Sequence, residues 1–291
     1  MFVLTTDSTV DMTREFMELR SIPFVPLIYI SKNEEHFDDM TLESANMIYE
    51  KMRNGEVITT SQPSEKQFID MWEPYIANNI DVLYIGFSSA LSGTVNSARL
   101  AKDELLKKYL GRRIEIVDSL DASGGEGLLL RHVCDYMKEG HDLDESLRFA
   151  ENLKLRIHHW YTVDNLVYLK RSGRVSAASA FLGSMLRIKP VMNMDNVGRL
   201  IPREKVNGRK TSIRSIFNHM VDSISKDENE NLYIHITNAD SLDDANMLKE
   251  LILAKFSFIK EVQITSVGAV IGSHCGPGTL ALFFVGALRV D

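Results

Sequence analysis

The chain has 291 residues, of which 44% are hydrophobic and 25% charged, and its formal net charge is -7. This composition is typical of a globular protein, and the length allows one large domain or two ordinary ones. The negative charge disfavours a general nucleic-acid-binding protein, which needs a basic face to contact phosphates. The sequence also contains no polybasic segment of the kind that would bind an anionic membrane surface.

The cysteines and the apolar segments indicate the compartment. The two cysteines, Cys134 and Cys275, lack the CxxC spacing of a zinc or redox site, so they suit a reducing cytosol. The N-terminus has no basic flank and only a short apolar run, unlike a signal peptide. The longest apolar stretch, Leu280–Leu288, is far shorter than the ~20 residues that span a bilayer. We therefore expect a cytoplasmic protein with no membrane-spanning segment.

The first half of the sequence predicts strands that alternate with helices. The predicted strands are Phe2–Thr6, Pro23–Ile30, Val82–Phe87 and Arg113–Val117. The predicted helices run from Asp11 or Thr13 to Leu19, over Thr41–Arg53, from Ser64 to about Ala77, and over Thr94–Leu110. Ser64 and Gln67 match a capping box at the start of the third helix. This alternation predicts parallel βαβ units, in which ligands bind at the carboxyl ends of the strands.

The second half predicts a different order of elements. The predicted strands are His158–Val163, Ile188–Met194, Gly198–Pro202, Leu232–Thr237, Glu261–Val267 and Thr279–Val285. The predicted helices are Ala177–Leu186, Thr211–Ser225 and Leu242–Phe256, and Lys226–Asn231 is predicted to be a loop. We place a domain boundary near residue 155. The predicted fold is therefore α/β, with an N-terminal parallel-sheet domain over 1–155 and a C-terminal α/β domain over 156–291.

Two hydroxyl-rich motifs precede predicted helices. Ser88–Thr94 follows a strand, and the free N–H groups of the helix that it opens favour an anion. Ser92 and Thr94 could add hydroxyl donors there, but capping of the helix by one of them explains the motif equally well. In Thr60–Ser64, a loop followed by a helix cap explains Ser64. It does not explain the two additional hydroxyl residues upstream of Ser64.

Two glycine-rich motifs complete the set of candidate sites. Asp118–Gly127 follows a strand and allows close backbone approach, but its spacing is not that of a dinucleotide-binding motif. Gly272–Thr279 places His274 among small residues, although a lone histidine is more often structural. A Cys275–His274 dyad is disfavoured, because adjacent side chains of an extended chain point to opposite faces. The sequence contains no GxSxG, HExxH or complete P-loop motif, so it predicts a polar site without catalytic machinery.

Taken together, these motifs resemble the DegV family of bacterial fatty-acid-binding proteins, the acyl carriers called FakB. The matching segments are TDST at Thr6–Thr9, TSQPS at Thr60–Ser64, SSALSGT at Ser88–Thr94, VDS at Val117–Ser119, SGGEG at Ser123–Gly127, LKRSGRVS at Leu169–Ser176, LGSMLRIKP at Leu182–Pro190 and SHCGPGT at Ser273–Thr279. They extend over essentially the whole chain, and their order and spacing are specific. The sequence departs from the family pattern at Cys275, where threonine is common.

The resemblance implies a DegV-like fold with a long-chain fatty acid bound between two α/β domains, and no cofactor, metal or catalytic residue. It implies that the carboxylate is held by Thr60, Ser92 and His274, together with Ser61, Gly93 and Thr94. A supporting loop would contain Ser123, Gly125, Gly127, Ser273 and Cys275. Arg174 and Arg209 would contact a separate ATP-dependent fatty acid kinase, which makes acyl-phosphate for phospholipid synthesis. Such a carrier is not itself an enzyme, and the resemblance leaves room for transient contact with a membrane surface.

Two other functions stay open at this stage. The first is a hydrolase of acyl esters that uses Ser92 with His274, although the sequence has no nucleophile elbow. The second is a substrate-binding protein of the dihydroxyacetone kinase type, in which His274 would trap a ketone.

Overall fold

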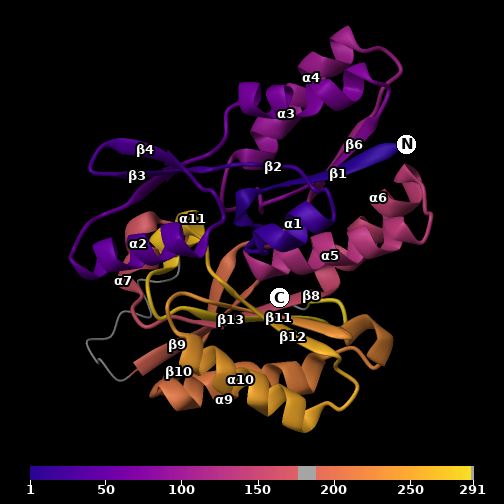
Figure 1. The fold of residues 1–291 in the computed structure, drawn as a ribbon. Helices are drawn as coiled ribbons and strands as arrows, with labels where there is room; N and C mark the ends of the chain where they lie inside the picture. The colour runs from indigo at the N-terminus through magenta and orange to yellow at the C-terminus, as the bar shows by residue number, and fades with distance from the viewer. Residues whose placement is uncertain (176–187, 290–291) are drawn as a thin grey trace.

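The computed structural model, which describes residues 1–175 and 188–289, contains a four-stranded parallel sheet built from the N-terminal half of the chain (Figure 1). Its strands, in spatial order, are β2 (Phe24–Val25), β1 (Phe2–Asp7), β6 (Asp81–Gly86) and β7 (Ile114–Asp118). All three strand pairs are parallel. The α/β fold class and the N-terminal parallel sheet predicted from the sequence are therefore confirmed.

Helices cover both faces of this sheet. On one face lie α3 (Glu65–Ala77) and α4 (Thr94–Lys108), and on the other lie α5 (Gly124–Lys138) and α6 (Leu143–Leu153). The capping box that the sequence predicts at the start of α3 is present, with Ser64 and Gln67 each accepting from the other's backbone N–H. The sequence reading missed α5 and α6.

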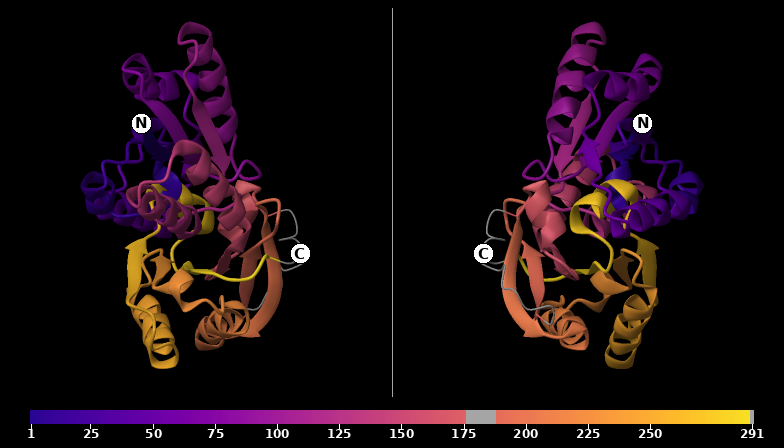
Figure 2. Two further views of the ribbon diagram at one scale, coloured as in Figure 1. Left: turned by 90° about the vertical axis from the view of Figure 1, so that its right-hand side faces the viewer. Right: turned by 90° about the vertical axis from the view of Figure 1, so that its left-hand side faces the viewer.

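A mixed sheet of six strands forms the other half of the molecule. Its strands, in spatial order, are β10 (Leu200–Asn207), β9 (Ile188–Met194), β8 (Ile157–Thr162), β13 (Leu280–Val285), β11 (Tyr233–Asn238) and β12 (Glu261–Ser266). Of its strand pairs, β11 and β12 run parallel and the others antiparallel. The helices α9 (Arg209–Ser223) and α10 (Leu242–Lys255) pack on one face, whereas α5 packs on β8, β11 and β13. Helix α5 thus contacts both large sheets, while α3 with α4 and α9 with α10 lie at opposite ends of the molecule (Figure 2).

A third, small sheet corrects one prediction. The sequence predicted a single strand over Pro23–Ile30, but this segment forms β2 in the parallel sheet and then β3 (Ile28–Ser31) in a separate antiparallel sheet with β4 (Glu34–Phe37) and β5 (Thr59–Ser61). Between them lies Pro26, which has no N–H to donate to a strand ladder. The chain therefore changes sheets there.

The remaining elements connect the two halves. They are the helices α1 (Arg14–Leu19), α2 (Leu42–Arg53), α7 (Val167–Ser172) and α11 (Ala269–Cys275) and the 3-10 helices η1 (Ser8–Val10), η2 (Lys154–Arg156) and η3 (Glu228–Asn231). The 3-10 helix η3 lies within Lys226–Asn231, which the sequence predicted to be a loop. Helix α11, near the C-terminus, packs on α2, β3 and β5 of the N-terminal half. The sheets change at the predicted boundary near residue 155, but one hydrophobic cluster extends over both halves, so the two-domain division stays a prediction.

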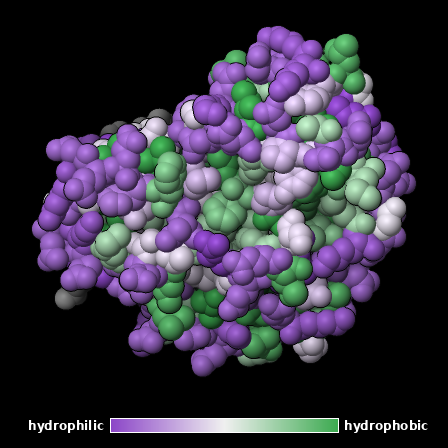
Figure 3. All heavy atoms as spheres, turned by 45° about the horizontal axis from the view of Figure 1, so that its top comes forward, coloured by the Kyte–Doolittle hydropathy of each residue, from purple (hydrophilic) through white to green (hydrophobic). Residues whose placement is uncertain are grey.

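The surface of the molecule and the lengths of its helices bear on whether it could enter a membrane. On one face, apolar side chains gather near the centre and hydrophilic side chains surround them (Figure 3). Within residues 1–175 and 188–289, no helix is both long enough and apolar enough to cross a membrane. The helix predicted over Ala177–Leu186 lies outside the described residues.

Candidate functional site

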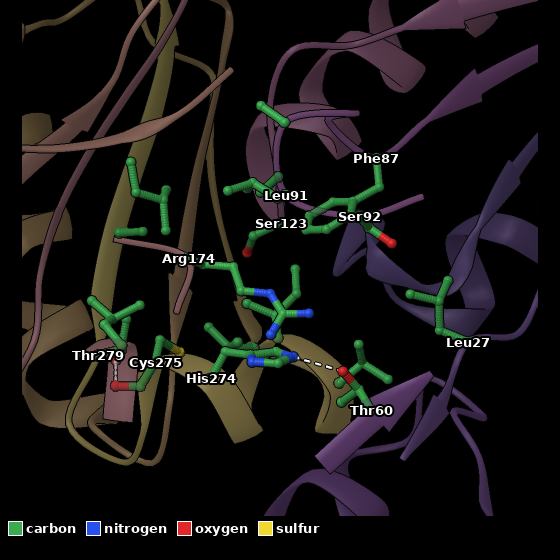
Figure 4. A pocket seen from close by; sticks show the side chains of 18 of the residues that line it. Leu27, Thr60, Phe87, Leu91, Ser92, Ser123, Arg174, His274, Cys275 and Thr279 are labelled. Atoms are coloured by element: carbon green, nitrogen blue, oxygen red, sulfur yellow. Dashed lines mark hydrogen bonds between the residues drawn. The ribbon is translucent and has the colours of Figure 1, made fainter. Parts of the chain in front are cut away.

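A cavity of about 670 Å³ lies between the two halves of the molecule (Figure 4). This volume is within the range of about 300–1,000 Å³ that is usual for small-molecule sites. Much of the wall is apolar, and its larger apolar residues are Leu27, Phe87, Leu91, Leu169, Leu200, Val267, Val270 and Ile271. These residues come from both halves of the chain, so the cavity exists only when the halves pack together.

One polar contact joins the two halves at this cavity. Thr60 lies on β5 and His274 near the end of α11, and the Thr60 Oγ1 atom is 2.7 Å from His274 Nε2. Both side chains line the cavity (Figure 4). Packing of α11 on β3 and β5 brings the two residues together. The structure therefore places in contact two residues that the family resemblance assigns together to the carboxylate.

The imidazole of His274 is neutral at pH 7. Burial and, as the smaller cause, the positive charge of Arg174 lower its pKa to about 4. In a neutral imidazole one nitrogen donates a hydrogen bond and the other accepts one. If Nε2–H donates to Thr60, the Thr60 hydroxyl keeps its own hydrogen for a group in the cavity. The pair can therefore present a donor to an anion without carrying a charge.

Ser92 provides a second hydroxyl from the loop between β6 and α4, and it also lines the cavity. Its Oγ accepts from the backbone N–H of Thr94 at 3.3 Å and lies 2.8 Å from Thr94 Oγ1. Thr94 itself is buried and does not line the cavity, whereas Gly93 and the exposed Ser61 do. The N-cap residue of α4 is Gly93, which makes no side-chain capping bond. We refer to Thr60, Ser92 and His274 as the polar site.

Gln62 fixes the position of this loop relative to β5. Its Nε2 donates to the carbonyl oxygen of Gly93 at 3.3 Å and to Ser97 Oγ at 3.0 Å. A Cβ atom on Gly93 would lie 2.1 Å from Gln62 Oε1, so a larger residue would displace the Gln62 side chain from these contacts. Gln62 was not selected from the sequence, although it is part of the TSQPS motif.

The predicted supporting loop is helical in the structure. Ser123 lies at the N-cap position of α5 and lines the cavity, where its Oγ donates to Asp11 and lies 3.0 Å from Thr237 Oγ1. Gly125 and Gly127 lie in the first turns of α5 and do not line the cavity. A Cβ on Gly125 would lie 2.3 Å from Asp121 Oδ1, and one on Gly127 would lie 2.4 Å from a backbone oxygen. These glycines allow α5 to pack closely, and their support of the site stays a prediction.

Ser273 and Cys275 lie on α11, so the prediction of extended chain around His274 was wrong. Ser273 Oγ donates to the carbonyl oxygen of Val270 at 2.7 Å, and Ser273 does not line the cavity. Cys275 does line it, and burial raises the pKa of its thiol to about 12. The thiol is therefore protonated at neutral pH and is a poor nucleophile. This protonation, and not an extended backbone, disfavours a Cys275–His274 dyad.

The two arginines predicted to contact a partner have different environments. Arg174 is exposed, lines the cavity, and directs its guanidinium toward His274 and Thr60 (Figure 4). Arg209 is the first residue of α9. Its Nε is 2.8 Å from Asp244 Oδ2, and its Nη1 is 3.8 Å from Asp164 Oδ1. The partner role of both arginines stays a prediction.

Comparison with known proteins decides the family. The model of the DegV family, described as uncharacterised proteins, matches residues 1–287. The chain belongs to the DegV family. A DegV domain-containing protein of Clostridium perfringens is 38% identical over 286 residues, which cover 98% of this chain and 97% of the relative.

Solved structures of DegV proteins share the fold over the whole chain. A DegV protein of Thermus thermophilus, described by its fatty acid binding, has a TM-score of 0.87 and 30% identity and covers 98% of this chain and 99% of its own. DegV of Bacillus subtilis, described as a fatty acid binding protein, has a TM-score of 0.82, 28% identity and the same coverage. The fatty acid kinase B3 protein of Streptococcus pneumoniae, loaded with linoleic acid, has a TM-score of 0.83 over 98% of this chain and 99% of its own, but at 21% identity it shows the fold alone.

Among the residues of the cavity wall that the sequence reading of this DegV protein missed are two on one strand of the six-stranded sheet. His159 and Tyr161 lie two positions apart on β8 and both line the cavity. Alternation along a strand places such residues on one face. The alternating pattern was visible in the sequence, but nothing in it showed which face of the strand would meet a cavity.

Proposed function

We propose that this DegV protein binds one long-chain fatty acid, with the acyl tail in the cavity and the carboxylate at the polar site. The observation that carries this proposal is the combination of a largely apolar cavity with Thr60, Ser92 and His274, three uncharged hydrogen-bonding groups from separate segments. The descriptions of the Thermus and Bacillus relatives as fatty-acid-binding proteins support it.

The tail supplies most of the affinity in this proposal. Burial of one methylene group contributes about 0.8 kcal/mol, so a chain of roughly fifteen contributes on the order of 10 kcal/mol. A hydrogen bond to a charged group contributes only about 1.5–3 kcal/mol net. The polar site therefore determines the position of the carboxylate more than the strength of binding.

The chemistry of the polar site suits a carboxylate that must still react. Hydroxyl and imidazole donors can satisfy the anion with single hydrogen bonds, whereas a bidentate arginine would engage both oxygens. The exposed Arg174 adds positive charge near Thr60 and His274 without being one of the three groups. One carboxylate oxygen can then stay available.

We propose further that the bound acid is presented to a separate ATP-dependent fatty acid kinase. The carboxylate oxygen would attack the γ-phosphorus of ATP, the bond to the bridging oxygen would break, and ADP would leave with the electron pair. Ser61, Gln62 and Arg174 line the cavity and are exposed, so a partner can approach the polar site from solvent. The likeness of the motifs to FakB carriers supports this step. In this role the chain carries a lipid, and the kinase performs the chemistry.

Lipid analysis of the purified protein tests the binding proposal. Organic extraction of denatured protein should yield about one C14–C18 fatty acid per chain, as the family resemblance implies. Protein that contains no lipid after purification, and that does not take up added fatty acid, would overturn the proposal. Addition of kinase and ATP to the loaded protein should then produce acyl-phosphate, and failure of this second step alone would overturn only the kinase role.

The structure favours neither of the other two functions. In a hydrolase, Ser92 should contact His274, but Ser92 pairs with Thr94 and His274 with Thr60. Among the described residues, no carboxylate contacts His274 as the third member of a triad would. A ketone as small as dihydroxyacetone would leave most of the apolar wall without contacts. Turnover of an acyl ester, or a stable adduct on His274, would be evidence for one of these functions.

A further inference from the structure

We infer that Asp11 and Asp38 are positioning residues for His274, because together they hold the first turn of α11, the helix that carries this histidine. Neither carboxyl lines the cavity, so both would act through the helix and not on the ligand. For its effect on the ligand, the inference rests on the proposed fatty-acid-binding function. The position of His274 itself can be measured without a ligand.

Helix α11 is short and has no side-chain cap of its own. It contains seven residues, and its N-cap residue is Gly268, which has no side chain to accept a backbone N–H. The N–H of Gly268 donates instead to Oδ1 of Asp11 at 2.8 Å, and Asp11 is only 4% exposed. The other oxygen of Asp11 accepts from the hydroxyl of Ser123, at the N-cap of α5. One buried carboxyl therefore joins the starts of two helices.

A second buried carboxyl reaches the same turn of α11. Asp38 Oδ1 accepts from the Met40 N–H at 3.2 Å, and the backbone of Val270, the second residue of α11, also forms a hydrogen bond with this carboxyl. A Cβ atom on Gly268 would lie 2.9 Å from Asp11 Oδ1 and 3.5 Å from Asp38 Oδ2. Both carboxyls thus approach one point at the start of the helix. We call Asp11 and Asp38 the carboxyl clamp.

The clamp bears on the polar site through the length of α11. His274 lies on this single short helix, five positions after its first residue, and its Nε2 is 2.7 Å from Thr60 Oγ1 on β5. A hydrogen bond is lost when its atoms separate by about 1 Å beyond that distance. A small movement of the first turn of α11 would therefore be enough to separate His274 from Thr60.

The carboxyl clamp is buried without a positive charge to balance it. Within residues 1–175 and 188–289, neither carboxyl forms an ion pair with a lysine, arginine or histidine. The titratable and charged groups that face the two carboxyls from the elements around them are Asp7, Arg14, Glu15, Tyr29, Asp39, Tyr49, Glu126 and Cys275. The base among these, Arg14, donates to Glu18 and to the backbone oxygen of Asp39.

This environment makes the clamp sensitive to pH. Burial is the largest cause that raises the pKa of Asp11 to about 8 and that of Asp38 to about 7, and the charge of Asp38 adds to the effect on Asp11. Because both values lie above the unfolded value of 3.8, the folded chain binds more protons, and ionisation destabilises the clamp as the pH rises through 7 and 8. At pH 9 two like charges would face each other at Gly268, so the hold on α11 should weaken.

The pKa of His274 provides the test, because it depends on how deeply α11 holds the imidazole. Protein labelled with 15N-histidine is titrated by NMR, and the His274 signals are identified by their loss in His274→Gln. Asp11→Ala and Asp38→Ala should each raise this pKa from about 4 by about one unit, since a loosened helix exposes the imidazole to water. Asp11→Asn and Asp38→Asn retain an acceptor of the same shape and should leave it unchanged. Asp142→Ala, which removes the carboxylate that caps α6, is the matched control.

Two further measurements use the same variants. In the unmodified protein the His274 signals should move between pH 7 and 9 as the clamp ionises, and in the Asp11→Asn, Asp38→Asn double variant they should not. With kinase and ATP at pH 7, Asp11→Ala should lower acyl-phosphate formation about tenfold, which is the effect of one misplaced hydrogen bond, while co-purified lipid falls less.

The possible outcomes separate the inference from the proposed function. An unchanged His274 titration in both alanine variants would overturn the inference, as would asparagine variants or the control if they shift it as much as alanine does. If the alanine variants do not fold, the pH measurement decides, and His274 signals that stay fixed from pH 7 to 9 would overturn the inference. The titration needs neither lipid nor kinase, so protein that binds no fatty acid would overturn the proposed function and leave the positioning of His274 standing.

Discussion

Two groups of buried polar side chains in this protein differ in where their hydrogen bonds go. One is the polar site at the cavity. The other, which we call the carboxylate network, surrounds the TDST motif at the end of β1 and consists of Thr6, Asp7, Thr9, Tyr84 and Glu126. Both come from motifs that resemble the DegV pattern, so the sequence alone did not distinguish them. The structure distinguishes them by their neighbours.

In the carboxylate network, the hydrogen bonds are internal. Asp7 accepts from the Thr9 N–H at 3.0 Å, the Tyr84 hydroxyl at 2.7 Å and the Phe87 N–H at 3.1 Å. Burial and the nearby Asp7 charge raise the pKa of Glu126 well above its usual value, so Glu126 is protonated. None of these residues lines the cavity. The network therefore stabilises the fold, whereas the polar site keeps hydrogen-bonding capacity for a ligand.

The largest effect on this comparison is expected from Asp7→Ala. The change leaves the buried donors of Thr9, Tyr84 and Phe87 without an acceptor, so the free energy of unfolding should fall by about 3–5 kcal/mol. Urea denaturation measures this. As a control, Asp70→Ala removes an exposed carboxylate that pairs with Lys66 and should change stability by less than about 0.5 kcal/mol. An Asp7→Ala variant as stable as the unmodified protein would show that the network is not structural.

At the polar site, Ser92→Ala and His274→Ala should impair function more than folding. Under the proposed function, each would remove one hydrogen-bonding group from the carboxylate site while the buried tail is unchanged. With kinase and ATP, acyl-phosphate formation should fall about 10- to 100-fold, while co-purified lipid falls less. Ser64→Ala deletes a hydroxyl that caps α3 outside the cavity and should leave acyl-phosphate formation unchanged. Normal yields from both polar-site variants would contradict the assignment.

Arg174, which lines the cavity, and Arg209, which does not, together test the predicted partner surface. The double variant Arg174→Ala, Arg209→Ala should fold and retain its fatty acid, but should bind the kinase more weakly and raise the apparent KM for this protein about tenfold. Only Arg209→Ala should reduce stability, by about 0.2–1 kcal/mol, because Arg209 pairs with Asp244.

The exposed Arg14, which pairs with Glu18 in α1, provides the matched control for these arginines. Arg14→Ala should leave kinase binding unchanged. If the double variant loses lipid or unfolds while its affinity for the kinase holds, the arginines belong to the cavity or to the core and not to the partner surface.

The smallest expected effect is the pH dependence that His274 contributes. Its folded pKa of about 4 lies below the unfolded value of 6.5, so the unfolded chain binds more protons between these pH values. Stability from His274 is therefore fully present above pH 6.5 and is lost as the pH falls toward 4. Relative to His274→Gln, the unmodified lipid-free protein should lose stability over this window in urea denaturation at several pH values. A constant difference would show that His274 is not buried in its neutral form.

Much of the fold could be predicted because its signals are local. Strand alternation, the capping box at Ser64 and the strand predicted over Ile188–Met194 depend on residues a few positions apart, and the structure confirms them. Helix α5 was missed because the glycines that begin it are typical of a turn, whereas α6 was missed although a capping box of Asp142 and Glu145 marks its start. In the structure these glycines let the helix lie against Asp121 and the backbone near Val10, which is a property of the packing.

The sequence by itself determined the order of the elements and the residue types available to the site. Only the tertiary structure decided which residues meet. Thr60 and His274 come into contact because α11 packs on β5, and Arg174 faces the cavity instead of only solvent. The neutral state of His274 likewise follows from burial. Contacts and burial depend on how the two sheets enclose a cavity, and this packing joins residues too far apart in the chain for local patterns to specify.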